Sequence, residues 1–127
     1  MYTYSFEKLE VWKFSRILAK NIYLMTKKFP VEEKFALANQ MQQASVSVVS
    51  NIAEGSARTS YKEQMRFIEL AYSSLMELYS QSCISMDINH ISEEDFKIKD
   101  MEIKEISNKL NALKKAYLTK VNNQINK

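Results

Sequence analysis

Few side chains in this sequence are suited to covalent or metal chemistry. His90 is the only histidine and Cys83 the only cysteine, and they stand seven residues apart. Serine and cysteine nucleophiles are usually activated by a histidine, and a di-iron bundle needs Glu-x-x-His motifs on two helices, which this chain lacks. A single glycine cannot build a glycine-rich phosphate loop. We therefore expect no catalytic residue, no metal site and no cofactor, and the sequence predicts that the protein is not an enzyme.

Positive charge is the feature most able to bind a ligand. The formal net charge is only +3, but it is unevenly distributed along the chain. Residues 1–30 carry six basic and two acidic groups, and residues 104–127 carry six basic and one acidic. Residues 31–103, in contrast, carry six basic and twelve acidic groups. The basic charge therefore lies at the two ends of the sequence.

The composition favours one domain of long helices over residues 1–127. With one glycine and one proline, the chain lacks the turn residues that sheets and loop-rich folds need. No apolar run approaches the roughly 18 residues of a membrane span, and the polar, aromatic N-terminus is not typical of a signal peptide. Cys83 alone cannot form an internal disulfide, which fits a reducing compartment. We expect a cytoplasmic protein that does not associate with membranes.

Four amphipathic stretches predict helices over residues 7–28, 31–54, 61–88 and 93–122. The predicted inner stripe of the second is Ala38, Met41, Ser45, Val48 and Ile52. The last has apolar residues spaced 3, 4, 3, 4 and 4, namely Ile103, Ile106, Leu110, Leu113, Tyr117 and Val121. Pro30 is suited to open the second helix, Ser60 and Glu63 to form a capping box for the third, and Ser92 to cap the fourth. Short connections imply antiparallel neighbours, so we predict an all-α, up-down-up-down four-helix bundle.

The junction between the second and third helices is the most distinctive stretch. Gly55 follows the predicted second helix, where a left-handed residue often ends a helix. Asn51 and Glu54 precede it, and a carboxylate there opposes the helix dipole. Two explanations stay open for this pair: a salt bridge of Glu54 to Arg58 or Arg66 or a backbone hydrogen bond, or a polar contact with a partner or a neighbouring subunit.

The predicted topology brings residues 1–13, 50–66 and 112–127 to one end of the bundle, which we call the basic end. It carries nine basic and four acidic residues, whereas the opposite end, residues 21–35 and 84–100, carries five and seven. The candidate nucleic-acid-binding residues at the basic end are Lys8, Lys13, Arg58, Lys62, Arg66, Lys114, Lys115 and Lys120. They could attract phosphate or be ordinary solvated surface charges. The aromatic residues nearby could stack on unpaired bases or anchor the core or an interface: Tyr2, Tyr4, Phe6, Tyr61 and Tyr117.

Several segments carry a resemblance to a known family. They are residues 9–13 (LEVWK), residues 29–33 (FPVEE), Gln40 with residues 44–47 (ASVS), residues 67–78 (FIELAYSSLMEL) and above all residues 51–58 (NIAEGSAR). This pattern resembles the four-helix bundle proteins of 23S rRNA intervening sequences, over about residues 6–90. Relatives often have basic residues where this chain has Gln42 and Gln43, so nucleic-acid contacts are not carried over to that helix.

The resemblance implies a bacterial cytoplasmic protein that forms a homopentamer around a central channel. Relatives include accessory proteins of diversity-generating retroelements, where a basic pentamer engages nucleic acid and a reverse transcriptase. The family has no established catalytic residues. Together with the charge pattern, this favours a non-catalytic oligomer that associates with RNA or DNA. The alternative is a structural or scaffolding oligomer that acts through contacts with another protein only.

Overall fold

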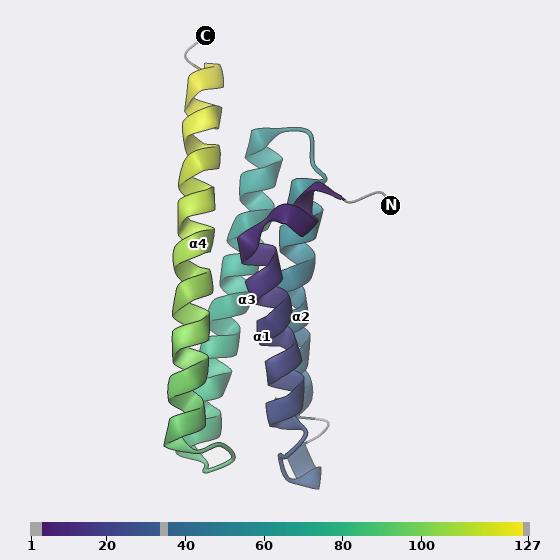
Figure 1. Cartoon of the computed structure of the whole chain (residues 1–127), viewed down its shortest axis with the longest axis vertical. Helices are drawn as coiled ribbons and strands as arrows, with labels where there is room; N and C mark the ends of the chain where they lie inside the picture. Colours follow the sequence, from purple (N-terminus) through teal and green to yellow (C-terminus); the bar gives the residue numbers. More distant parts are fainter. Residues whose placement is uncertain (1–3, 34–35, 126–127) are drawn as a thin grey trace.

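The computed structural model describes residues 4–33 and 36–125. All regular elements in that part of the chain are helices. The elements in order are η1 (Ser5–Lys8), α1 (Glu10–Thr26), η2 (Val31–Glu33), α2 (Leu37–Ser56), α3 (Tyr61–Asp87) and α4 (Glu93–Ile125). Tyr2 and Lys127 lie outside the described residues. The four α-helices run alternately up and down (Figure 1), which confirms the predicted antiparallel bundle.

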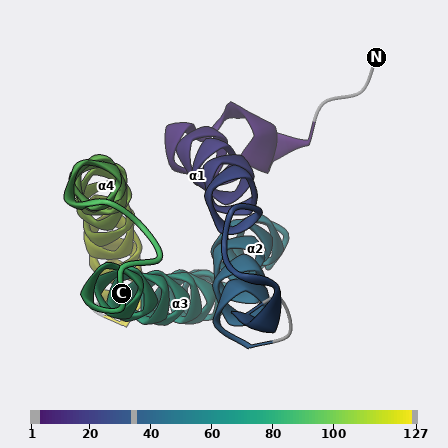
Figure 2. The same cartoon turned by 90° about the horizontal axis from the view of Figure 1, so that it is seen from below.

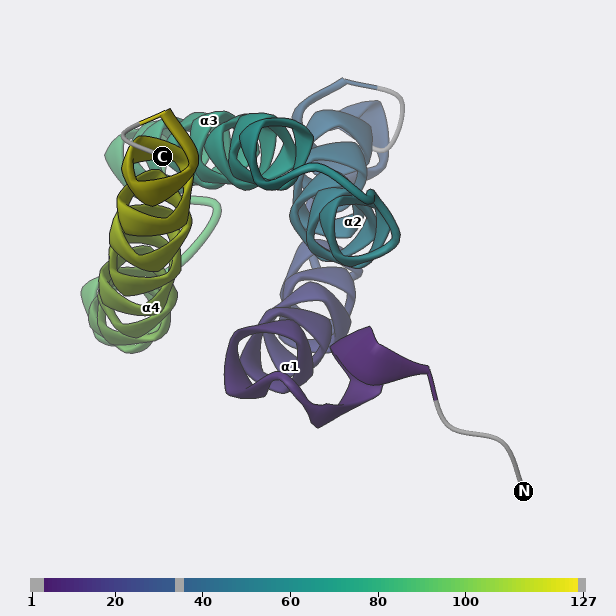
Figure 3. The same cartoon turned by 90° about the horizontal axis from the view of Figure 1, so that it is seen from above.

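The helices follow one another around the bundle in chain order. Figures 2 and 3 show α2 between α1 and α3, and α4 beside α3. At the end that carries both termini, α1 and α4 stand apart (Figure 3). Side-chain contacts nevertheless join these two helices along their length: Asn21 donates to Glu102 at 3.0 Å, and Lys109 pairs with Glu10 at 3.0 Å.

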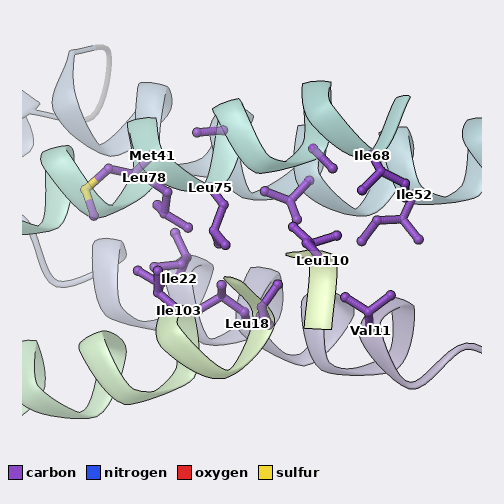
Figure 4. Close-up of a cluster of buried hydrophobic side chains, with 14 of the residues drawn as sticks. Val11, Leu18, Ile22, Met41, Ile52, Ile68, Leu75, Leu78, Ile103 and Leu110 are labelled. Atoms are coloured by element: carbon purple, nitrogen blue, oxygen red, sulfur yellow. The ribbon is translucent and has the colours of Figure 1, made fainter. Parts of the chain in front are cut away.

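Each α-helix contributes aliphatic side chains to one core (Figure 4). The stripe predicted for the second helix is buried throughout: Ala38, Met41, Ser45, Val48 and Ile52. In α4 the predicted seam divides into two parts, because Ile103, Ile106 and Leu110 are buried whereas Leu113, Tyr117 and Val121 are half-buried. Burying a Leu or Ile side chain contributes about 1.5–3 kcal/mol relative to leaving it exposed, so the middle of the bundle provides most of the stability.

The prediction that the second helix starts at residue 31 is wrong. Val31–Glu33 form only a 3-10 turn, and α2 begins at Leu37. Helices in proteins depend on packing of an apolar face more than on propensity. Val31 is 73% exposed, and the buried stripe of α2 starts only at Ala38, so the side chain of Val31 does not provide packing for a longer helix.

The first helix also begins later than predicted, at Glu10 rather than residue 7. The preceding chain forms η1, in which the backbone N–H of Tyr4 donates to the Glu7 carboxylate at 2.9 Å. This turn folds the Phe6 ring against the Trp12 ring, with 5.1 Å between their centroids. Phe6 is therefore a packing anchor, one of the two alternatives that the sequence left open.

The third helix ends with a left-handed residue that the sequence reasoning missed. Asn89 has φ 62°, and it is the one non-glycine residue with positive φ in the described ranges. The N–H of His90 donates to Ser85 O at 2.8 Å and that of Asn89 to Met86 O at 3.0 Å, the pattern of a Schellman C-cap. Asparagine tolerates this conformation better than most residues.

Candidate nucleic-acid interface

Three segments far apart in the sequence meet at the basic end of the bundle. Figure 1 shows η1, the α2–α3 connection and the last turns of α4 at the same end. The hydroxyls of Ser5 and Ser56 are 2.9 Å apart, which ties η1 to the end of α2. Lys120 of α4 lies against Tyr61 at the start of α3, with 5.0 Å between its ammonium and the ring centroid. The topology on which the charge argument depends is therefore present.

Gly55 does not have the left-handed conformation that we predicted. It is buried within α2, and no glycine has positive φ. A Cβ atom on Gly55 would lie 2.9 Å from the Cβ of Phe67 and 3.3 Å from the carbonyl oxygen of Gln64. Glycine is needed because α3 approaches α2 too closely for a side chain, and α2 continues to Ser56 with Ala57 as its C-cap.

The α2–α3 connection is held by hydrogen bonds to the start of α3. The Ser60 hydroxyl accepts from Glu63 N at 3.1 Å, which confirms the N-cap half of the predicted capping box. The Glu63 carboxylate instead approaches Arg66 at 3.5 Å. The Gln64 side chain donates to the carbonyl of Arg58 at 2.9 Å. These contacts fix the backbone from which Arg58 projects.

Asn51 and Glu54 have different roles. The Asn51 amide donates to the Ser47 carbonyl at 2.9 Å and to its hydroxyl at 3.1 Å. That hydroxyl lies 2.8 Å from the hydroxyl of Ser74, so Asn51 belongs to a polar contact between α2 and α3. Glu54 is exposed, and no ion pair within residues 4–33 and 36–125 includes it. The salt bridge of Glu54 to Arg58 or Arg66, one of the explanations that the sequence left open, is therefore not formed within the described residues, where both guanidinium groups lie over the Phe67 ring.

Two of the candidate arginines lie over the ring of Phe67. The guanidinium carbons of Arg58 and Arg66 lie 4.6 Å and 5.6 Å from its ring centroid. Phe67 is only 7% exposed, so its ring is a fixed surface for these side chains. Guanidinium groups stack well on rings and keep their edges available for bidentate contacts with phosphate. Arg58 is exposed, and its guanidinium is therefore both positioned and accessible.

A second ring cluster joins α3 to α4. The ammonium of Lys120 lies 5.0 Å from the ring centroid of Tyr61 and 5.8 Å from that of Tyr117. Both rings are half-buried, and burial raises the pKa of the Tyr117 phenol. The sequence predicts that both tyrosines and Lys120 lie at this end, but it does not predict that the ammonium of Lys120 contacts both rings.

Carboxylates compensate only part of the positive charge. Lys114 lies 3.7 Å from Glu69, and Arg66 pairs with Glu63. In the part of the chain that the structure describes, the other six candidates form no ion pair: Lys8, Lys13, Arg58, Lys62, Lys115 and Lys120. All six are exposed. Most of the candidate cations are thus available to an anionic ligand.

Lys13 lies on α1, where the basic surface continues in a direction that the sequence reasoning missed. Trp12, Lys13, Arg16, Ile17 and Lys20 line a shallow groove on this helix. The Arg16 guanidinium lies 5.5 Å from the Trp12 ring centroid. The spacing of residues 13, 16 and 20 by three and four was visible in the sequence and could have revealed this stripe.

Gln42, to which the family resemblance does not carry nucleic-acid contacts, has a structural contact. Its amide donates to the Thr26 hydroxyl at 3.0 Å and so joins α2 to α1. That hydroxyl itself donates to the carbonyl of Ile22 at 2.8 Å. Gln42 therefore contributes to helix packing.

The residues considered for chemistry lie away from this interface. Cys83 is a half-buried free thiol in α3, and the His90 ring lies 5.2 Å from that of Phe29. A search of the described residues found no group of three or more His, Cys, Asp or Glu that could hold a metal ion. In the same residues, every helix is too short or too polar to cross a membrane.

The fold and the basic end define a class: an all-α, antiparallel four-helix bundle in which three segments that carry basic residues lie at one end. The chain belongs to the 23S rRNA-intervening sequence protein family, whose model matches residues 7–112. A similar solved structure is that of a protein of unknown function from the S23 ribosomal protein family of Bacteroides thetaiotaomicron. It has a TM-score of 0.77 and 21% identity, and the alignment covers 83% of this chain and 98% of that one. No curated protein gave a significant match.

Proposed function

We propose that this protein is a non-catalytic, self-associating protein that binds nucleic acid through its basic end. One observation carries the proposal: six exposed cations from three segments lie at this end without carboxylate partners in the described chain. Cations that contact phosphates release condensed counterions, and this release supplies much of the affinity of basic proteins for nucleic acid. We include a cytoplasmic location in the proposal.

The fixed side chains support binding better than flexible lysines alone would. Arg58 and Arg66 are positioned on the ring of Phe67. A pre-positioned cation loses less conformational entropy on binding than a free side chain does. Membership of a family named for rRNA intervening sequences makes structured rRNA a reasonable first ligand. The proposed kinship with retroelement accessory proteins makes DNA the second ligand to test.

The direct experiment is fluorescence anisotropy at low ionic strength, with a labelled structured rRNA fragment and with a DNA duplex. We expect both to bind, because phosphate contacts do not depend on sequence. If neither binds, the cations are solvated surface charges and the proposal is wrong.

A scaffolding oligomer that acts through protein contacts is the second candidate. It is favoured by apolar side chains of α1 that remain exposed in the single chain: Phe14 is 36%, Ile17 53% and Leu24 54% exposed. Their spacing of three and seven residues places them along one side of the helix. We propose that this stripe contributes to self-association, as a pentamer according to the family resemblance. The oligomer mass in solution, measured with and without RNA, separates the two candidates.

A further inference from the structure

The end of α4 lies beyond the region that the family shares. The family match stops at residue 112, whereas α4 continues to Ile125. Figure 1 shows these last turns extending past the α2–α3 connection. A helix end that is outside the matched domain but remains in contact with it can provide a function of its own.

The charge of this helix end is of one sign. Glu105 is the last acidic residue of the chain, and Lys109, Lys114, Lys115 and Lys120 follow it within α4. Lys109 and Lys114 reach back to Glu10 and Glu69 on neighbouring helices. Lys115 and Lys120 have no such partner among the residues that the structure describes. They are the cations of α4 that remain open to a ligand.

Two aromatic rings lie near one of these cations. Leu113, Tyr117 and Val121 form the half-buried side of the helix end. The Lys120 ammonium lies 5.8 Å from the ring centroid of Tyr117 and 5.0 Å from that of Tyr61 in α3. A pair of tyrosines with a lysine beside them combines stacking surfaces with a phosphate contact, which is the chemistry that binds single-stranded nucleic acid.

We propose that the start of α3 and the end of α4 form a site for unpaired nucleotides. In this site bases stack on Tyr61 and Tyr117, and Lys120 pairs with the adjacent phosphate. The inference rests on the proposed function and narrows its ligand to a strand with unpaired bases.

Lys120 can exchange its contact with the two tyrosine rings for a contact with a phosphate. The contact of its ammonium with half-exposed rings is weak, and in the described structure no carboxylate holds it. An arriving base can therefore take its place over a ring, while the flexible side chain turns to the phosphate of the same strand. Base-paired nucleotides cannot use the rings, because their faces are already stacked within the duplex.

The test compares an unstructured single-stranded RNA of about twelve nucleotides with a duplex of the same length, by anisotropy with the full chain. Tyr61→Leu combined with Tyr117→Leu removes both rings but keeps apolar bulk. We expect about tenfold weaker binding of the single strand and unchanged binding of the duplex. The same experiment with single-stranded DNA shows whether the 2′-hydroxyl contributes.

Two variants act as controls. Tyr117→Phe keeps the ring, so single-strand affinity should stay within about twofold of the wild type, since stacking does not need the hydroxyl. Lys115→Gln removes one cation from the same helix end, and it should weaken binding of the single strand and of the duplex by a similar small factor. Circular dichroism melting of each variant checks that the bundle is intact.

Three outcomes would overturn the inference. If the variant with both tyrosines replaced by leucine lost affinity equally for the single strand and the duplex, the tyrosines would act through packing of the bundle and not by stacking on bases. No loss with either ligand would show that the rings do not contact bases. A changed oligomer mass would assign them to a subunit contact. In each case wild-type binding to the duplex leaves the proposed function standing, whereas failure of the wild type to bind any nucleic acid refutes the proposed function itself.

Discussion

Gly55 of α2 faces the Cβ of Phe67 of α3 so closely that an added Cβ would lie 2.9 Å away. The same Phe67 ring lies beneath the guanidinium groups of Arg58 and Arg66. The packing of α2 against α3 therefore sets the position of two candidate phosphate contacts. Stability and the proposed site are connected at this one point of the fold.

We predict that Gly55→Ala destabilises the protein. Alanine favours a helix by about 1 kcal/mol over glycine, but overpacking costs about 1–3 kcal/mol. The Phe67 Cβ cannot move without its backbone, so we expect an overpacking cost at the upper end of this range and a net loss of about 1–2 kcal/mol in urea unfolding. Ser50→Ala, at an exposed position of the same helix, is the control and should not destabilise. A Gly55→Ala protein as stable as the wild type would contradict the close approach.

Asn51 and Glu54 should respond differently to substitution. Asn51→Ala removes the hydrogen bonds to Ser47 and should cost about 1 kcal/mol. Glu54→Gln removes a carboxylate that opposes the helix dipole and has no ion-pair partner in the described residues. It should leave stability unchanged or raise it by a few tenths of a kcal/mol. Thermal melting of both variants tests this prediction. A marked loss of stability for Glu54→Gln would show that the Glu54 carboxylate stabilises the fold.

The sequence predicted the bundle well because its signals were periodic and repeated. The buried stripe of α2 and the Ser60 and Ser92 caps were confirmed, the latter by a 3.0 Å bond from Asp95 N. Prediction was poor where one tertiary contact decides the outcome. The position of Gly55 depends on its distance from Phe67, and the start of α2 depends on whether Val31 finds a packing partner.

The candidate cations could be assigned to one end of the molecule from topology alone. Their contacts could not be assigned, because side-chain direction depends on neighbours from other helices. The contact of Lys120 with Tyr61 and Tyr117 is the main example. Glu54 is the opposite case, since the nearby arginines in the sequence suggested an ion pair, whereas both guanidinium groups lie over the ring of Phe67.

The contact between α1 and α4 should depend on pH. The hydrogen bond from Lys109, helped by its charge and that of Lys13, lowers the pKa of the Glu10 carboxyl below its usual 4.5. A lowered folded-state pKa stabilises the protein above the unfolded value, and the effect is lost as pH falls through the folded value. Glu10→Gln should thus lower the Tm slightly near neutral pH, and the difference should vanish at about pH 2.

The matched control for this experiment is Glu105→Gln, because Glu105 is exposed and forms no ion pair in the described chain. It should show no comparable pH-dependent difference. Added salt should reduce the effect of Glu10→Gln, since the pair is exposed to solvent. A Tm difference that is independent of pH would show that Glu10 acts through packing.

Charge reversal locates the binding surface. Lys114→Glu with Lys115→Glu at the basic end should weaken RNA binding by about tenfold or more, because each lost phosphate contact removes released counterions. Lys27→Glu with Lys28→Glu makes the same change in net charge at the opposite end, where both lysines are exposed. This control should have a much smaller effect. Equal losses would mean that net charge, and not the basic end, determines binding.

The exposed apolar residues of α1, Phe14, Ile17 and Leu24, give a prediction for self-association. Ile17 is 53% exposed in the single chain, so Ile17→Asp should leave the fold intact. If the stripe lies in a subunit contact, the buried carboxylate should be costly, and the mass measured by light scattering should fall. Met101→Asp, at a 72% exposed position of α4, is the control. An unchanged mass for Ile17→Asp would exclude this side of α1 from the interface.

The salt dependence of RNA affinity is the most direct test of the central claim. Plotted as log K against log salt concentration, binding through several phosphate contacts should give a straight line with a slope of about −3 or steeper. The Lys114→Glu, Lys115→Glu variant should give a shallower slope, and the Lys27→Glu, Lys28→Glu variant the wild-type slope. A flat dependence, or equal slopes for all three proteins, would contradict phosphate binding at the basic end.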